Sequence, residues 1–126
     1  MTKVSNEHST LIAIAKPAAR VVVRFRSRTI ADTDNALAVE EPNYSPVFYL
    51  PKRDVDLSVL VPSTTTTFCP RKGHATHYSI AFDGHQSIDA AWEYEDPLPA
   101  VDAIADHIAF YEDRVDELCV NVSQTL

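Results

Sequence analysis

The segment Cys69-Pro-Arg-Lys72-Gly73 carries the residue types best suited to chemistry. A thiol becomes nucleophilic when a neighbouring ammonium group lowers its pKa, and Lys72 follows Cys69 by three positions. Lys72 could instead hold a phosphate or carboxylate group of a ligand as a point charge. In a third interpretation, Cys69 is buried and inert beside a turn that needs Gly73 for its backbone angle. The sequence leaves these three roles open.

Four aromatic residues and one aspartate are the other candidates for a binding site. Tyrosine and tryptophan combine an apolar ring with a polar tip, which suits a pocket for a small molecule or a cation. The same side chains could also be core residues whose hydroxyl groups bond to the backbone. Asp54 could orient a polar ligand, cap a turn or pair with Lys72. The predicted ligand-binding residues are Tyr49, Asp54, Cys69, Lys72, Gly73, Tyr78, Trp92 and Tyr94.

The chain lacks the residues for a zinc knuckle or a disulfide framework. Cys69 and Cys119 are its two cysteines, whereas a structural zinc site needs four thiolate or imidazole ligands. We therefore expect two reduced thiols, no bound metal and no cofactor. Nucleotidyl transfer would need metal-binding carboxylates and a cradle for phosphates. Asp54-Val-Asp56 has a suitable carboxylate spacing but no such loop beside it.

Length and charge restrict the kinds of protein that this chain can be. Its 126 residues suit a single domain. Eighteen acidic against eleven basic residues give a net charge of −7, which disfavours nucleic-acid binding because phosphate contacts depend on Lys and Arg. With two glycines, the chain cannot form a dinucleotide-binding fingerprint or a P-loop.

Neither export nor membrane insertion is predicted. The apolar run over residues 11–15 is shorter than the core of a secretory signal. No stretch approaches the roughly 18 apolar residues that a spanning helix requires. We therefore expect a cytoplasmic protein whose partner is a small molecule rather than a nucleic acid or a membrane.

Alternation and proline spacing predict a mainly β fold. Val21, Val23 and Phe25 alternate with polar residues over residues 20–26, as in a half-buried antiparallel strand. A turn at Ser27-Arg28 would join this strand to a second one over residues 29–32. Four prolines between residues 42 and 62 make a helix there unfavourable. Further short strands are predicted over residues 36–40, 47–50, 58–61 and 64–68.

Asp83-Gly84 predicts a hairpin between strands over residues 74–82 and 86–94. A two-residue loop would put the apolar residues of the two arms on opposite faces. A three-residue loop over residues 82–84, with Gly84 left-handed, would place Tyr78, Ile80 and Trp92 on one face. We therefore favour the three-residue loop.

The last third of the chain predicts one short helix and a final hairpin. Pro97 and Pro99 end the sheet segment, and apolar residues at helical spacing follow over residues 100–107. The hairpin would join residues 109–111 to residues 115–122 around Glu112-Asp-Arg114. In an alternative interpretation, the helix continues to Leu118.

Four stretches of the chain together carry a family resemblance. They are Val23-Arg-Phe25 through Ile30-Ala31-Asp32-Thr33, Tyr49-Leu-Pro51-Lys-Arg-Asp54-Val55, Thr67-Phe-Cys69-Pro70-Arg-Lys72-Gly73-His-Ala75-Thr-His-Tyr78 and Ala90-Ala91-Trp92-Glu-Tyr94-Glu-Asp-Pro97. In this order they resemble the domain of unknown function 427 family, and the resemblance covers about residues 20–120. The first stretch departs from the family, which usually has glycine in the first hairpin turn, where this chain has Ser27 or Arg28.

This resemblance implies a fold but no established activity. The family's fold is similar to the β-tent architecture of Mss4-like domains, in which curved antiparallel sheets meet at an angle and enclose a pocket. Relatives in that architecture often hold zinc in paired Cys-x-x-Cys knuckles, whereas Cys69 is followed by Lys72 in place of the second cysteine. A nucleotidyltransferase label is sometimes attached to the family.

Residues and resemblance together predict a single mainly β domain with curved antiparallel sheets of β-tent type and one short C-terminal helix. We expect an extension over residues 1–19, the domain over residues 20–122 and a tail over residues 123–126. The predicted function is binding of a small ligand in a pocket lined by aromatic residues and Lys72. The alternatives are a nucleotidyltransferase-like enzyme and thiol chemistry at Cys69, so the sequence does not decide whether the domain is an enzyme.

Overall fold

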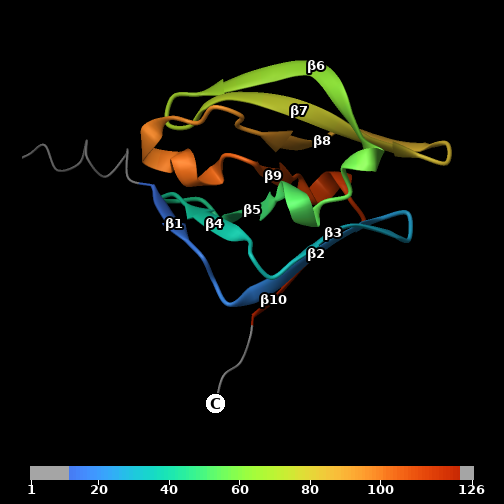
Figure 1. Cartoon of the computed structure of the whole chain (residues 1–126), viewed down its shortest axis with the longest axis horizontal. Helices are drawn as coiled ribbons and strands as arrows, with labels where there is room; N and C mark the ends of the chain where they lie inside the picture. The colour runs from blue at the N-terminus through green and yellow to red at the C-terminus, as the bar shows by residue number, and fades with distance from the viewer. Residues whose placement is uncertain (1–11, 123–126) are drawn as a thin grey trace, which may run out of the picture.

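The computed structural model describes residues 12–122 and shows a mainly β fold built from two antiparallel sheets (Figure 1). The fold class predicted from the sequence is therefore confirmed. The larger sheet has seven strands, in the order β1 (Ala13–Ala15), β4 (Leu37–Glu40), β5 (Val47–Pro51), β9 (His107–Phe110), β8 (His85–Glu93), β7 (Gly73–Phe82) and β6 (Leu60–Cys69). The smaller sheet has three strands, in the order β10 (Glu117–Val122), β2 (Ala19–Phe25) and β3 (Arg28–Thr33).

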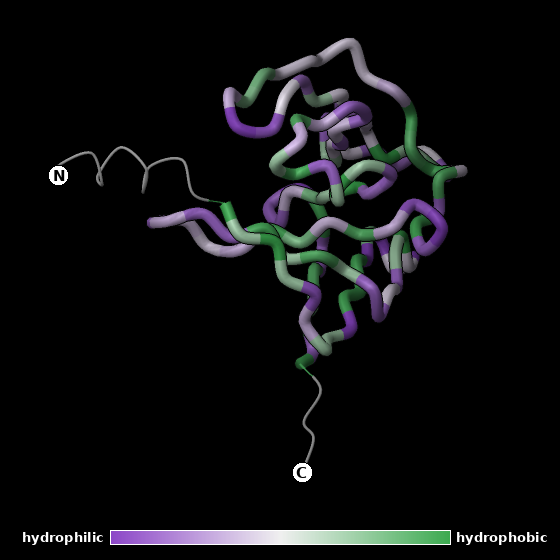
Figure 2. The backbone as a smooth tube through the Cα atoms, turned by 60° about the vertical axis from the view of Figure 1, so that its left-hand side comes forward, coloured by the Kyte–Doolittle hydropathy of each residue, from purple (hydrophilic) through white to green (hydrophobic). Residues whose placement is uncertain are grey.

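Two hydrophobic clusters cover opposite faces of the larger sheet. In the first, residues of β2 and β3 pack against the larger sheet, where Leu50, Ile80 and Ile108 are fully buried. In the second, Tyr49 and Tyr94 pack with residues of the 3-10 segment η3 (Pro99–Ile104). Figure 2 shows hydrophobic stretches running through the centre of the molecule and hydrophilic ones toward its loops. The central strands of the larger sheet are thus covered on both faces, whereas its edge strands β1 and β6 have no buried residue.

The predicted first hairpin is confirmed, but its turn lies one residue earlier. β2 buries Val21, Val23 and Phe25 on one face and pairs with β3. The turn residues are Arg26 and Ser27, which both have left-handed backbones with φ of 52° and 64°. Positive φ at both central positions is typical of a type I′ turn, whose twist matches that of the strands.

The three-residue loop predicted between β7 and β8 is wrong. Phe82 pairs with His85, so the loop is the two-residue turn Asp83-Gly84, although Gly84 is left-handed as expected, with φ of 80°. Trp92 pairs with His77, and its side chain therefore lies on the face opposite Tyr78.

The prediction failed because it assumed that one face of the hairpin is buried. β7 buries Ala75 in one cluster and Ile80, from the opposite face, in the other, and His77 on the face of Ala75 is also buried. A bulge at Asp89, whose φ is 51°, shifts the register in the middle of the hairpin.

The C-terminal predictions also need correction. The expected helix over residues 100–107 is the shorter 3-10 segment η3, interrupted at Val101, whose backbone is not helical. β9 and β10 do not form a hairpin, because β9 pairs with β5 and β8 whereas β10 pairs with β2 in the other sheet. The 3-10 turn η4 (Glu112–Arg114) carries the chain from one sheet to the other.

The remaining segments complete the two sheets. The strands expected over residues 58–61 and 64–68 are parts of the long strand β6, which follows the 3-10 turn η2 (Leu57–Val59). A third turn, η1 (Lys52–Asp54), follows β5 directly. β1 falls within the segment expected to be an N-terminal extension and pairs with β4 at the edge of the larger sheet. Residues 1–11 and 123–126 of the expected extension and tail lie outside the described residues.

The two tight turns give opposite expectations for glycine substitution. A Ser27→Gly variant should be more stable by about 1 kcal/mol, because glycine adopts the left-handed backbone without the cost of a Cβ atom. Gly84→Ala is the matched control and should be less stable by about 1 kcal/mol. A Cβ atom at Gly84 would meet nothing within 4 Å, so that change tests the backbone alone. Urea unfolding midpoints measure both, and a destabilised Ser27→Gly variant would contradict the turn.

Candidate functional site

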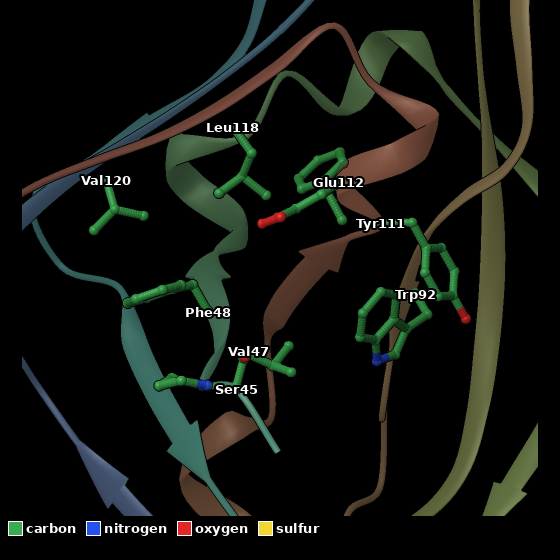
Figure 3. A pocket seen from close by; sticks show the side chains of 10 residues that line it. Ser45, Val47, Phe48, Trp92, Tyr111, Glu112, Leu118 and Val120 are labelled. Carbon is green, nitrogen blue, oxygen red and sulfur yellow. The ribbon is translucent and has the colours of Figure 1, made fainter. Parts of the chain in front are cut away.

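A pocket opens where strands β5 and β9 separate. The two strands pair at Leu50–Ile108 and Pro51–His107. Beyond these pairs, β5 remains bonded to β4 and β9 remains bonded to β8, so the larger sheet splits between them. The resulting pocket has a volume of about 390 Å³ (Figure 3).

The walls of the pocket are mainly apolar and come from both sheets. Val47 and Phe48 of β5 form one side, and β9 contributes Phe110. Leu118 and Val120 of β10 close the pocket from the smaller sheet (Figure 3). The sequence did not indicate these residues, because β10 was expected beside β9 rather than across the pocket from β5.

Two aromatic rings, Trp92 of β8 and Tyr111, form the opposite wall. Their centroids lie 4.4 Å apart with an interplanar angle of 40°. The indole Nε1 of Trp92 donates a hydrogen bond to the Tyr49 hydroxyl oxygen at 3.2 Å. The Arg114 guanidinium lies 4.7 Å from the centroid of the Tyr111 ring. These contacts from residues outside the pocket hold both rings in place.

Glu112 supplies the charge of the pocket. It is the first residue of η4, and its carboxyl group points toward the space between β5 and β10 (Figure 3). Among the described residues that line the pocket, Glu112 is the only one with a formal charge. Ser45 adds a hydroxyl group to the lining, so the site can offer a carboxylate, aromatic faces and apolar surface.

Six of the eight predicted site residues come together beside the pocket, namely Lys72 and five residues near it. The Lys72 side chain is 9% exposed, and its Nζ atom lies 2.6 Å from Glu41 Oε1 and 3.8 Å from Cys69 Sγ. Tyr49, Tyr94, Cys69 and Trp92 belong to the hydrophobic cluster next to this ion pair. Gly73 follows directly, with φ of 115°. Lys72 is therefore paired with Glu41 and not with Asp54, which the sequence had left open as one possible partner.

The two tyrosines of this cluster are held neutral. Burial raises the pKa of Tyr49 far above its usual value, and burial also raises the pKa of Tyr94 to about 12. The rings lie 6.4 Å apart. Protonated phenols of this kind do not serve as bases at neutral pH, and Tyr49 instead positions Trp92.

Tyr78 and Asp54 lie away from that cluster. The Tyr78 hydroxyl donates to Glu93 Oε1 at 2.5 Å, and Glu93 Oε2 lies 2.8 Å from Lys52 Nζ. The Glu93 residue is 0% exposed. Asp54 accepts a hydrogen bond from the Thr33 hydroxyl at 2.7 Å. Sequence reasoning did not single out Glu93 or Lys52, although a glutamate between Trp92 and Tyr94 in a buried strand was a usable signal.

Neither a metal-binding group of side chains nor a membrane-spanning helix is found among the described residues. Within residues 12–122, no group of three or more His, Cys, Asp or Glu side chains is arranged to hold a metal ion. Asp54 and Asp56 are both engaged, since Asp56 pairs with Arg28 at 2.8 Å. No helix in this part of the chain has the length and apolar character needed to cross a membrane.

Comparison with known families gives one match. The family model labelled NTP_transf_9 and described as a domain of unknown function (DUF427) matches residues 13–121. The match begins at β1 and reaches into β10, so both sheets are included. Comparison with curated proteins gives no match.

Because the Glu93 carboxylate is buried, removing its cation should destabilise the fold more than removing its own charge. Lys52→Met should lower the free energy of unfolding by about 3 kcal/mol, because it leaves the fully buried Glu93 without its cation. Glu93→Gln should cost only about 1 kcal/mol, since the amide can still accept from Tyr78 and Lys52 is partly exposed to water. Chemical denaturation measures both. Equal losses would show that the charge of Glu93 is not the determinant.

The raised pKa values predict instability in alkaline solution. Burial raises the pKa of Tyr78 to about 12, as for Tyr94, so these phenols stay protonated when folded but ionise near pH 10 when unfolded. The folded state then binds more protons, and the free energy of unfolding should fall as the pH rises from 10 toward 12. Denaturation at a series of pH values measures this slope, which Tyr94→Phe should reduce.

The absorbance of tyrosinate provides the check on this expectation. Tyr44→Phe, which removes an exposed phenol, serves as the reference variant. Ionisation of Tyr78 and Tyr94 in the folded protein below pH 10.5 would contradict the prediction.

Proposed function

The chain belongs to the domain of unknown function 427 family, and we propose that its domain binds a small, largely apolar molecule in the pocket between β5, β9 and β10. The observation that carries the proposal is the separation of β5 from β9 after two residue pairs. This separation leaves a gap within a sheet, and the gap is lined by aromatic and aliphatic side chains from both sheets.

The composition and size of the pocket support a small-molecule ligand. Ligand pockets typically measure about 300–1,000 Å³ and combine apolar walls with a few polar groups. This pocket measures about 390 Å³ and combines five apolar side chains of the β strands with Trp92, Tyr111 and Glu112.

The proposal keeps the aromatic part of the predicted binding site and changes the rest. Trp92 lines the pocket, while Tyr49 contributes through its hydrogen bond to the indole. Lys72 is paired with Glu41, so the polar group that we assign to the site is Glu112. Phosphate recognition, which nucleotidyl transfer requires, is not favoured by a pocket whose charge is negative.

Trp92 provides a direct assay, because it is the only tryptophan of the chain. We expect 4-phenylbutan-1-ol, a neutral probe, to change the Trp92 fluorescence saturably, with a Kd of the order of 1 mM. Val120→Phe fills the pocket and should weaken binding at least tenfold. Cys119→Phe adds the same ring to an exposed neighbouring position on β10 and should leave binding unchanged.

Thermal unfolding monitored by circular dichroism establishes that both variants are folded. Fluorescence that does not saturate, or equal binding by the two folded variants, would overturn the proposal.

A further inference from the structure

We propose that the ligand of this pocket is an organic cation, in which an ammonium group is attached to an apolar body. The inference rests on the proposed function and specifies the chemical class of the ligand. Three features carry it: the free carboxylate of Glu112, the aromatic wall and the absence of basic side chains from the described lining.

Glu112 has no counter-ion of its own within residues 12–122, since no Lys, Arg or His of that part forms an ion pair with it. Arg114 of η4 and Arg24 of β2 are both engaged elsewhere. Arg114 donates to the Asp89 carbonyl oxygen at 2.8 Å and lies over the Tyr111 ring. Arg24 lies 3.7 Å from Glu117 and donates to Thr29. A ligand ammonium would therefore supply the missing positive charge.

The aromatic wall favours the same charge. The face of an indole ring carries negative potential and attracts ammonium groups, most strongly where water is displaced. Trp92 is fixed at its polar edge by Tyr49 and along its ring by Tyr111. Such a ring can receive a cation without first losing conformational freedom.

The remaining walls of the pocket indicate that the rest of the ligand is apolar. Phe48, Leu118 and Val120 line the side across from Trp92, where they offer dispersion contacts and no hydrogen-bonding side chain (Figure 3). An apolar body of the ligand would cover these side chains. A carboxylate or phosphate ligand would lose hydration in the pocket while facing Glu112, which is unfavourable.

Three probes of equal shape test the inference by Trp92 fluorescence at pH 7. 4-Phenylbutylamine is a cation, 4-phenylbutan-1-ol is neutral and 4-phenylbutyrate is an anion. We expect the amine to bind about tenfold more tightly than the alcohol, and the butyrate to bind more weakly than either. The advantage of the amine should decrease as salt is added, because the Glu112 residue is exposed to solvent.

Two charge-neutralising variants test whether Glu112 is the residue that causes the preference for the amine over the alcohol. Glu112→Gln should bring the amine to within about twofold to threefold of the alcohol and leave the affinity for the alcohol unchanged. Asp113→Asn is the matched control, because it removes the same charge from the adjacent exposed residue, which does not line the pocket. This control should keep the full preference for the amine.

Each outcome decides between the two proposals. If the alcohol binds and the amine binds no better, or if Glu112→Gln keeps the preference, the cation inference is overturned while the proposed function stands. If none of the three probes binds, both are overturned. An amine preference that is lost in Glu112→Gln and kept in Asp113→Asn supports the inference.

Discussion

The pairing of β5 with β9 is the contact on which the rest of the molecule depends. It consists of two residue pairs, Leu50–Ile108 and Pro51–His107, and it joins the β1-β4-β5 part of the larger sheet to the β6-β7-β8-β9 part. Leu50 and Ile108 are almost completely buried, so apolar packing reinforces this short ladder. Directly after it, the Lys52 N–H donates to the Asp106 carbonyl oxygen at 2.9 Å. The two strands are therefore held together at one end of the junction and separate at the other.

Two ion pairs, each with at least one buried member, fix the segments around this junction. Lys52 follows β5 and reaches Glu93 on β8, while Lys72 precedes β7 and reaches Glu41 after β4. Each pair links the two parts of the larger sheet that meet at β5 and β9. A buried charge without its partner is costly, so such pairs restrict the ways in which the parts can be assembled. Lys72, for which the sequence suggested a role in chemistry or ligand binding, thus forms an ion pair that stabilises the fold.

Local patterns predicted the strands but not their partners. Alternation identified β2 correctly, because this strand buries one face along its whole length. The same reasoning failed for β7, which buries opposite faces at its two ends. Trp92 was found from its residue type, whereas Glu112 and Leu118 belong to the pocket only because β10 joins the other sheet. That pairing depends on contacts between distant parts of the chain, which periodicity does not encode.

The pocket lies where the ladder between β5 and β9 would otherwise continue. Continuing the β5–β9 register beyond Leu50–Ile108 would place Phe48 opposite Phe110, with both rings on the face that the smaller sheet covers. Leu118 and Val120 already pack against that cluster. Phe48 and Phe110 instead line the open gap together with these two residues of β10. The gap is therefore built into the folded chain, and a ligand would find it already formed.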